Sequence, residues 1–252
     1  MRRADVATRP TSALKLGILI VCMALLSAGF TSLGVWQLKR RAWKLDLIAR
    51  TDERVHAIPV DAPEPDAWPH LTAANAEYRH VKVSGQYLHD KETQVKAVTD
   101  IGAGYWVLTP LQTEHDIVLI NRGFVPSELR DPSMRAAGQV TGTVNITGLL
   151  RITEPEGAFL HDNDPNHNRW YSRDVSAIVT TQGLNAMQTA PYFIDADATV
   201  ASNAEEPIGG LTVVTFYNQH LNYAITWFTL ALMPVTFVLF TIRRRRQRSP
   251  DY

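Results

Sequence analysis

Residues 221–246 read LNYAITWFTLALMPVTFVLFTIRRRR. The apolar part, residues 221–242, contains no charged side chain. As a helix with a rise of about 1.5 Å per residue it reaches roughly 30 Å, the thickness of a bilayer hydrocarbon core. Aromatic residues near its start and four arginines after its end mark the two membrane interfaces. The stretch predicts a membrane-spanning helix over 221–242, followed by a basic tail over 243–252, with a kink at Pro234.

A second apolar stretch lies near the N-terminus, where residues 16–36 also lack charged side chains. Basic residues precede it, as they do in a cleaved signal peptide. The stretch is longer than the apolar region of a usual signal peptide, and no clear A-x-A cleavage site follows it. It therefore predicts a permanent transmembrane helix over 16–36.

The distribution of basic residues predicts the orientation. Four cations precede the first span and four follow it closely, so that helix alone decides nothing. No Lys or Arg occurs between Arg173 and Arg243, which by the positive-inside rule predicts a cytoplasmic tail. Residues 1–15 then share the cytoplasmic side, and 37–220 are extracytoplasmic. The short first segment, with Asp5, does not resemble a transit peptide, which favours a bacterial inner membrane over a mitochondrial one.

The segment between the spans is long enough for one domain with its own core. Residues 37–55 mix apolar and charged side chains and predict a helix that continues out of the membrane, ended by a proline-rich linker over 59–69. Alternating and β-branched runs predict strands over 81–87, 105–111, 117–120, 144–152 and 211–216. A hairpin turn is expected at 112–116 and a short helix at 172–182. The fold class is a membrane α+β protein, in which two transmembrane helices flank a β-rich, antiparallel extracytoplasmic domain.

Several catalytic and redox patterns are absent from the sequence. It has no C-x-x-C, C-x-x-C-H, G-x-S-x-G or H-E-x-x-H, and its single cysteine, Cys22, lies in the first span. We therefore expect no disulfide within the domain, no thiol-based copper chaperone and no enzyme. Acidic and basic residues balance at 25 each, and we expect no nucleic-acid partner.

His220 lies at the predicted outer mouth of the second span. A helical period places His220, Tyr223 and Trp227 on one stripe. Neutral histidine is a common axial ligand of haem iron, so an imidazole beside two aromatic rings at a membrane surface could bind a porphyrin. An interfacial histidine that only caps the helix beside an aromatic belt explains the same pattern.

The matching mouth of the first helix contains Trp36, Gln37 and Arg40. A guanidinium group there could hold haem propionates by charge-assisted hydrogen bonds. Interfacial anchoring or binding of lipid phosphate explains these residues equally well. Elsewhere, residues 121–126 fit a structural turn. Residues 168–174 fit either a packed corner with an Arg–Asp pair or a docking surface for a partner.

Six blocks of residues, taken in order, resemble one known family. They are Leu33-Gly34-Val35-Trp36-Gln37-Leu38-Lys39-Arg40-Arg41 with Lys44; Glu77-Tyr78-Arg79 with Val81-Lys82-Val83-Ser84-Gly85; Asn121-Arg122-Gly123-Phe124-Val125-Pro126; Asn168, Trp170, Arg173 and Asp174; Pro207-Ile208-Gly209-Gly210; and His220-Leu221 with Tyr223, Thr226 and Trp227. Over nearly its whole length the chain resembles the Surfeit-locus-one family of cytochrome c oxidase assembly factors.

The resemblance implies two transmembrane helices around an outer domain, and a role in inserting haem A into subunit I of haem-copper oxidases. In that family the histidine that matches His220 is the proposed haem ligand, and Trp36, Gln37 and Arg40 match the helix-one signature nearest the membrane. The polar pair Tyr171 and Ser172 falls in a block whose relatives vary, which leaves the docking role of that region open.

Two main hypotheses follow; a third, a membrane-anchored enzyme, has little support because the sequence shows no catalytic constellation. In the first, a non-catalytic assembly factor holds haem A transiently, with His220 as its only metal ligand, and acts with oxidase subunit I, membrane lipid and, as a second candidate, the haem A synthase. In the second, a membrane scaffold binds subunit I or the synthase and never touches haem.

Overall fold

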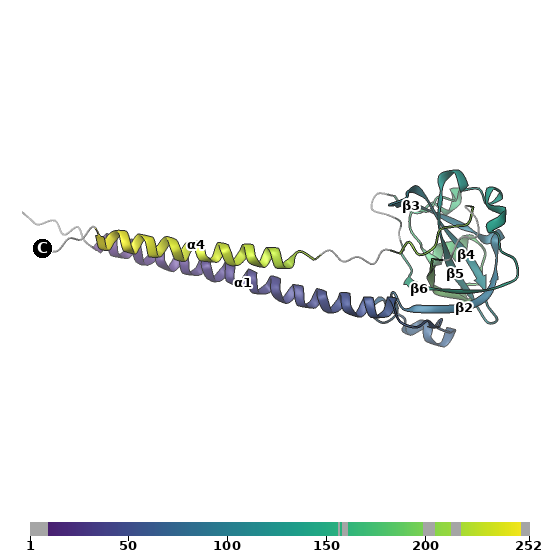
Figure 1. Cartoon of the computed structure of the whole chain (residues 1–252), viewed down its shortest axis with the longest axis horizontal. Helices are drawn as coiled ribbons and strands as arrows, with labels where there is room; N and C mark the ends of the chain where they lie inside the picture. Colours follow the sequence, from purple (N-terminus) through teal and green to yellow (C-terminus); the bar gives the residue numbers. More distant parts are fainter. Residues whose placement is uncertain (1–9, 156, 158–160, 199–204, 213–217, 248–252) are drawn as a thin grey trace, which may run out of the picture. The chain divides into compact units, whose positions relative to one another are not determined.

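The computed structural model describes residues 10–155, 157, 161–198, 205–212 and 218–247. The chain divides into two compact units, which we call the helix pair, Met1–Ala49 with Thr215–Tyr252, and the β domain, Arg50–Val214 (Figure 1). Two helices long and apolar enough to cross a membrane flank a β-rich domain in the sequence, which confirms the predicted fold class.

The two long helices are α1, Pro10–Val55, and α4, His220–Gln247. The stretch 37–55 contains no glycine or proline, so α1 continues beyond the apolar segment, as predicted. α1 ends at Val55. Pro59 favours an extended backbone at Ile58, the residue before it, so the helix does not continue through this point. α4 begins at His220 itself, so the candidate ligand occupies the first helical position.

Small residues line the contact between α1 and α4, which lie side by side (Figure 1). Gly34, Ala224, Ala231 and Pro234 are buried, whereas most large apolar side chains of both helices are exposed. The Ser27 hydroxyl donates to the carbonyl oxygen of Ala231 at 2.8 Å. Small side chains let helix backbones approach closely in a bilayer, and the exposed apolar side chains suit contact with lipid tails.

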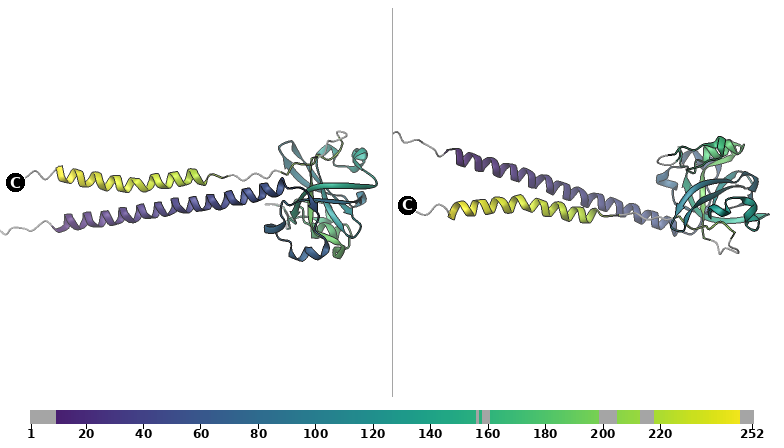
Figure 2. Two further views of the ribbon diagram at one scale, coloured as in Figure 1. Left: turned by 60° about the horizontal axis from the view of Figure 1, so that its bottom comes forward. Right: turned by 90° about the horizontal axis from the view of Figure 1, so that it is seen from above.

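The β domain contains seven strands: β1 Val60–Asp61, β2 His80–Tyr87, β3 Thr93–Thr99, β4 Gly102–Gln112, β5 Ile117–Pro126, β6 Thr143–Ile152 and β7 Thr189–Ala196. Their order is β1-β2-β6-β7-β5-β4-β3. An extra pairing of β2 with β4, through Gln86 and Tyr87, closes β2, β6, β7, β5 and β4 into a barrel-like ring (Figure 2).

Most ladders are antiparallel, as predicted, but two are not. β5 pairs with β7 and β1 with β2 in parallel. The parallel β5–β7 pair is possible because β6 and a helix, α3 Val175–Thr181, intervene in the chain and provide the crossover that parallel strands need.

The predicted strands at 81–87, 105–111, 117–120 and 144–152 correspond to β2, β4, β5 and β6, and the hairpin at 112–116 is correct. The short helix expected at 172–182 is α3. β3 and β7 were not predicted. In the expected strand 211–216, Leu211 and Thr212 are not in a strand and the remaining residues lie outside the described ranges. Further short helices are α2 Ala73–Ala76 and 3-10 turns at Pro65–His70, His89–Lys91, Ser127–Leu129, Pro132–Gly138, Pro165–His167 and Ala186–Gln188.

The core of the β domain has two clusters, one on each side of β5. Val118 and Ile120 belong to one, with Leu111, Leu150 and Tyr192. Leu119 faces the other, which contains Trp170, Phe193 and the α3 residues Val175 and Ile178. Because successive strand residues point to opposite faces, β5 is buried on both sides and its sequence is a continuous apolar run.

His80 on β2 is held by two acceptors. Its Nδ1 lies 2.8 Å from the carbonyl oxygen of Ala57, and its Nε2 lies 2.8 Å from Oδ2 of Asp197. Both ring nitrogens must therefore donate, which requires the charged imidazolium. Burial lowers the pKa of His80, but the hydrogen bonds and the Asp197 charge outweigh it and raise the pKa above its ordinary value of 6.5.

We therefore expect His80 to make the β domain less stable as pH rises. A group whose folded pKa is raised stabilises the fold fully below its unfolded pKa, near 6.5, and this contribution is lost as pH rises through the folded pKa. Urea midpoints at about pH 6 and about pH 8.5 should differ more for the wild type than for His80→Gln, which cannot titrate. Equal pH dependence in the two proteins would contradict the assignment.

Candidate functional site

Two predicted site residues from opposite ends of the chain meet in the helix pair. Nδ1 of His220 lies 2.7 Å from Oε1 of Gln37. An amide oxygen only accepts, so Nδ1 donates; in the neutral ring this leaves the lone pair on Nε2, the form in which imidazole binds metal ions. Nε2 makes no hydrogen bond with any residue that the structure describes. Gln37 therefore orients the imidazole through Nδ1, and Nε2 has no partner among the described residues.

Local sequence explains why this pair can form. His220 is the first residue of α4, and Oδ1 of Asn218 accepts from its backbone N–H at 3.4 Å. Ala224, one turn further, is buried and small, so α1 approaches α4 closely just below the histidine. Gln37 follows Gly34 by one turn and is 9% exposed, which fixes its amide in the helix contact. Burying a polar side chain is costly unless it is hydrogen-bonded, and His220 provides the hydrogen bond to the Gln37 amide oxygen.

Of the predicted aromatic residues, the structure turns only Trp227 toward the other helix. Its ring stacks on Phe30 of α1, with centroids 5.8 Å apart and an interplanar angle of 27°. Tyr223 and Trp36 are each 55% exposed. Phe30 carried no signal in the sequence beyond its apolar character. The two exposed rings therefore leave apolar surface near the histidine that neither helix covers.

Arg40 is exposed, and its guanidinium lies 4.1 Å from the ring centroid of Trp43. It forms no ion pair with a carboxylate in the part of the chain that the structure describes. Contact with a ring face leaves the N–H edge of a guanidinium free, so Arg40 can still donate to an anionic group.

No cluster of three or more His, Cys, Asp or Glu side chains that could hold a metal ion occurs among the described residues.

A buried network of charged and polar side chains in the β domain contains three residues of the family blocks, Glu77, Asn121 and Arg173. Asp195 on β7 is 3% exposed and accepts from Asn121, Arg151 and Arg173 at 2.7, 2.8 and 3.1 Å. Glu77 binds the same Arg151 at 2.7 Å. Sequence reasoning missed Asp195 and Arg151, because neither belongs to a recognisable motif.

The Arg–Asp pair considered for the corner 168–174 exists in a different form. Arg173 pairs with Asp195 at 3.1 Å and with Glu154 at 2.6 Å, both outside that segment. Asp174 instead caps α3, since its Oδ1 accepts from the backbone N–H of Ala177 at 3.1 Å. These contacts are structural, so the charged part of this block is explained without a ligand.

Two further family blocks pair with each other. The backbone N–H groups of Phe124 and Ile208 each donate to the carbonyl of the other at 2.9 Å. Gly123 has a φ of 128°, and a Cβ at this position would collide with the carbonyl oxygen of Ile208. Only glycine fits at this position, so Gly123 is a packing requirement. The turn expected at 121–126 is wrong, because these residues continue strand β5. The two blocks on the long helices, around Gln37 and around His220, differ from these: they bring polar and aromatic side chains together outside the core of the β domain.

Gly34 sets the spacing of the helix pair, and enlarging it should separate the helices. A Cβ at position 34 would lie 2.7 Å from Cε1 of Phe228. We expect Gly34→Leu to weaken the helix contact by about 1–3 kcal/mol through overpacking. The measurement is oxidative cross-linking of Ser27→Cys with Ala231→Cys in a Cys22→Ser background, which Gly34→Leu should reduce.

A compensating change distinguishes overpacking from a general defect. Removing the opposing ring with Phe228→Ala should restore cross-linking in the Gly34→Leu protein, because the added side chain then has room. If cross-linking were unchanged by Gly34→Leu, the close approach at this position would be refuted.

Comparison with known proteins places these features in a family. The model of the SURF1 family matches residues 24–232. Surfeit locus protein 1 of Rattus norvegicus is 39% identical over 216 residues, which cover 79% of this chain and 67% of the relative. The Homo sapiens protein of the same name is 38% identical over 219 residues, with 79% and 69% covered. A SURF1-like protein of Monosiga brevicollis is 35% identical over 230 residues, with 86% and 85% covered.

The matched region includes most of α1, the whole β domain and the first half of α4, so it contains both Gln37 and His220. The family predicted from the six sequence blocks is confirmed: the chain belongs to the SURF1 family of oxidase assembly factors.

Proposed function

We propose that this protein binds haem A transiently at the His220 end of the helix pair and assists its insertion into subunit I of a haem-copper oxidase. In this proposal Nε2 of His220 ligates the iron, and the protein performs no catalysis of its own. The observation that supports it is the 2.7 Å hydrogen bond from Nδ1 of His220 to Gln37, which leaves Nε2 available.

The groups around His220 suit an apolar, dianionic cargo. A ligating histidine normally donates its other N–H to an acceptor, which fixes the ring and raises its basicity, and Gln37 has this role here. Tyr223 and Trp36 offer exposed aromatic surface to a macrocycle. Arg40 provides a guanidinium for a propionate. A single protein ligand leaves the second axial position of the iron open, which suits a carrier that must release its cargo.

The proposal is tested by titrating the purified, detergent-solubilised protein with haem A and following the Soret absorbance. We expect saturable binding of one haem per chain. Absence of saturable binding, together with co-purification of subunit I without haem, would replace the proposal with a scaffold that recruits the oxidase subunit or the haem A synthase.

The proposed location is a bacterial inner membrane, with both chain ends in the cytoplasm and the β domain in the periplasm. The support is the run of arginines after the second span, opposite a segment without Lys or Arg.

A cysteine at position 101 should report this orientation. Ile101 is 54% exposed in the β domain, and Cys22 lies within α1. In a Cys22→Ser background, Ile101→Cys should react with a membrane-impermeant maleimide added to intact spheroplasts. A cysteine in place of Gln247, at the end of α4, should react only after lysis. The reverse pattern would invert the topology.

A further inference from the structure

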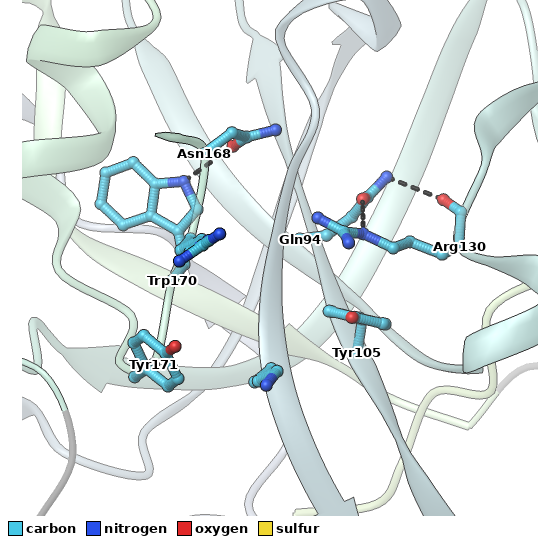
Figure 3. A pocket seen from close by; sticks show the side chains of 8 residues that line it. Gln94, Tyr105, Arg130, Asn168, Trp170 and Tyr171 are labelled. Atoms are coloured by element: carbon cyan, nitrogen blue, oxygen red, sulfur yellow. Dashed lines mark hydrogen bonds between the residues drawn. The ribbon is translucent and has the colours of Figure 1, made fainter. Parts of the chain in front are cut away.

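A cationic cavity of about 340 Å³ lies in the β domain beside β3 and the segment 168–171. Three basic residues, Lys96, Arg130 and Arg169, line it, and none of the described residues in its wall has a carboxylate. Figure 3 shows Trp170 and Tyr171 on one side and Tyr105, Gln94 and Arg130 on the other. The net charge of the chain is zero, so this excess of positive charge is local.

The three cations differ from the buried arginines of the same domain. Arg135, Arg151 and Arg173 each have a carboxylate partner within 2.6–2.7 Å. Lys96 and Arg169 form no ion pair within the described ranges, and neither does Arg130. All three side chains are exposed, so water solvates them, and together they give this surface a positive potential that attracts anions.

Neutral groups hold two of these cations in place. The Arg130 guanidinium lies 4.6 Å from the Tyr105 ring centroid, and its Nε donates to Oε1 of Gln94 at 3.3 Å. Nζ of Lys96 lies 5.5 Å from the Tyr171 ring centroid. Ring faces attract a cation without using its N–H donors. The remaining donors can therefore bind carboxylate oxygens by charge-assisted hydrogen bonds.

The opposite wall is fixed by a buried anchor. Trp170 is 1% exposed, and its Nε1 donates to Oδ1 of Asn168 at 2.9 Å (Figure 3). Asn168 has a φ of 51°, in the left-handed region that asparagine tolerates better than most residues. The carbonyl of Trp170 accepts from the backbone N–H of Lys96 at 2.9 Å, which attaches this wall to β3. The cavity is thus formed before any ligand arrives.

The edge of the sheet indicates which kind of anion fits. β3 is the last strand of the sheet, and its outer edge is contacted by Gln182 at Thr93 and by Trp170 at Val95 and Lys96. Among the described residues, no strand pairs with this edge beyond Lys96. By strand alternation, the amide of Val98 faces the same edge as that of Lys96, and their side chains share one face. Val98 is 89% exposed. An uncovered strand edge with an apolar side chain suits an extended peptide better than a small anion.

We propose that this surface binds an extended acidic segment of a partner protein, which lies along the edge of β3 beyond Lys96. Its carboxylates contact Lys96, Arg130 and Arg169, and an apolar side chain packs on Val98. This site is built only from residues of the β domain, and it needs no haem.

The test uses the full-length protein in detergent and a fluorescein-labelled hexapeptide, Glu-Thr-Glu-Thr-Val-Thr, followed by fluorescence anisotropy. We expect saturable binding that weakens with added salt, because exposed charges are screened. Lys96→Gln and Arg169→Gln should each weaken it about tenfold, the usual effect of losing one hydrogen bond to a charged group. Lys82→Gln is the matched control: it removes one exposed cation outside the cavity and should leave the affinity unchanged.

A second arm changes the ligand instead of the protein. The same peptide with glutamine in place of each glutamate should bind about a hundredfold more weakly, since two charged contacts are lost. Val98→Ser should weaken binding without altering its salt dependence. Equal affinity for the two peptides would overturn the proposal.

Binding of inorganic phosphate or dihexanoyl phosphatidylglycerol but not of the peptide, lost in Arg169→Gln, would assign the cavity to a phosphate group and also overturn the proposal. Unchanged thermal midpoints verify that the variants are folded. Because no haem is present, failure here leaves the His220 proposal standing.

Discussion

Replacing His220 with alanine is expected to lower the affinity for haem A by about a hundredfold or more, because it removes the proposed iron ligand. The Soret band of any remaining complex should also shift, since the iron loses its nitrogen ligand. Both effects are measured by titrating haem A into the detergent-solubilised protein. If affinity and spectrum are the same as those of the wild type, His220 is not the ligand.

Two matched variants separate ligation from folding. His220→Gly should regain a histidine-like spectrum when imidazole is added, because the small molecule can occupy the vacated position. Gln37→Leu keeps the volume of the side chain but removes the acceptor for Nδ1. We expect it to weaken binding about tenfold while the spectrum still reports a nitrogen ligand, the usual effect of losing a group that orients a metal ligand.

The second large effect is expected in the β domain, where Asp195→Ala should destabilise the fold by about 3–5 kcal/mol. The substitution leaves Arg151 and Arg173 without the carboxylate that both share, and it leaves the Asn121 amide without its acceptor. A loss of this size is a large part of the roughly 5–15 kcal/mol that stabilises a typical domain. Urea unfolding monitored by tryptophan fluorescence gives the measurement.

Asp61→Ala is the control for this substitution. Asp61 also pairs with a cation, Lys82 at 3.4 Å, but its side chain is 89% exposed. Solvent-exposed pairs contribute little, so the urea midpoint should barely move. Asp195→Asn, which retains the shape but not the charge, should resemble Asp195→Ala. If Asp61→Ala and Asp195→Ala shifted the urea midpoint equally, the buried network would contribute no more to stability than an exposed ion pair.

The strands that sequence predicted share a clear alternation or a β-branched run, as in 81–87 and 117–120. β3 escaped prediction because its outward residues, Gln94 and Lys96, are polar and its inward ones include Thr93 and Ala97. β7 escaped because Pro191 and Asp195 interrupt an apolar run that is buried on both faces. Both segments form strands because they pair and pack with residues far away in sequence, and local propensity carries no information about those contacts.

The candidate site shows the same division. A helical period could place His220 and Trp227 on one stripe, but it could not show which way that stripe turns about α4. That rotation is set by the close contacts of Gly34 with Phe228 and of Ser27 with Ala231. In this rotation His220 and Trp227 contact α1, through Gln37 and Phe30, whereas Tyr223 is exposed.

The sequence by itself determined the two helices able to cross a membrane, the β-rich domain between them, the family, and the position of His220 at the start of the second helix. These features depend on periodicity, length and short motifs, which are local properties of the chain. Only the tertiary structure decided that the strands close into a ring, that Asp195 and Arg151 connect residues of three separate family blocks, and that Gln37 binds Nδ1 of His220. Each of these is a contact between residues far apart in sequence, formed when packing fixes the relative position of whole elements, and no local pattern encodes it.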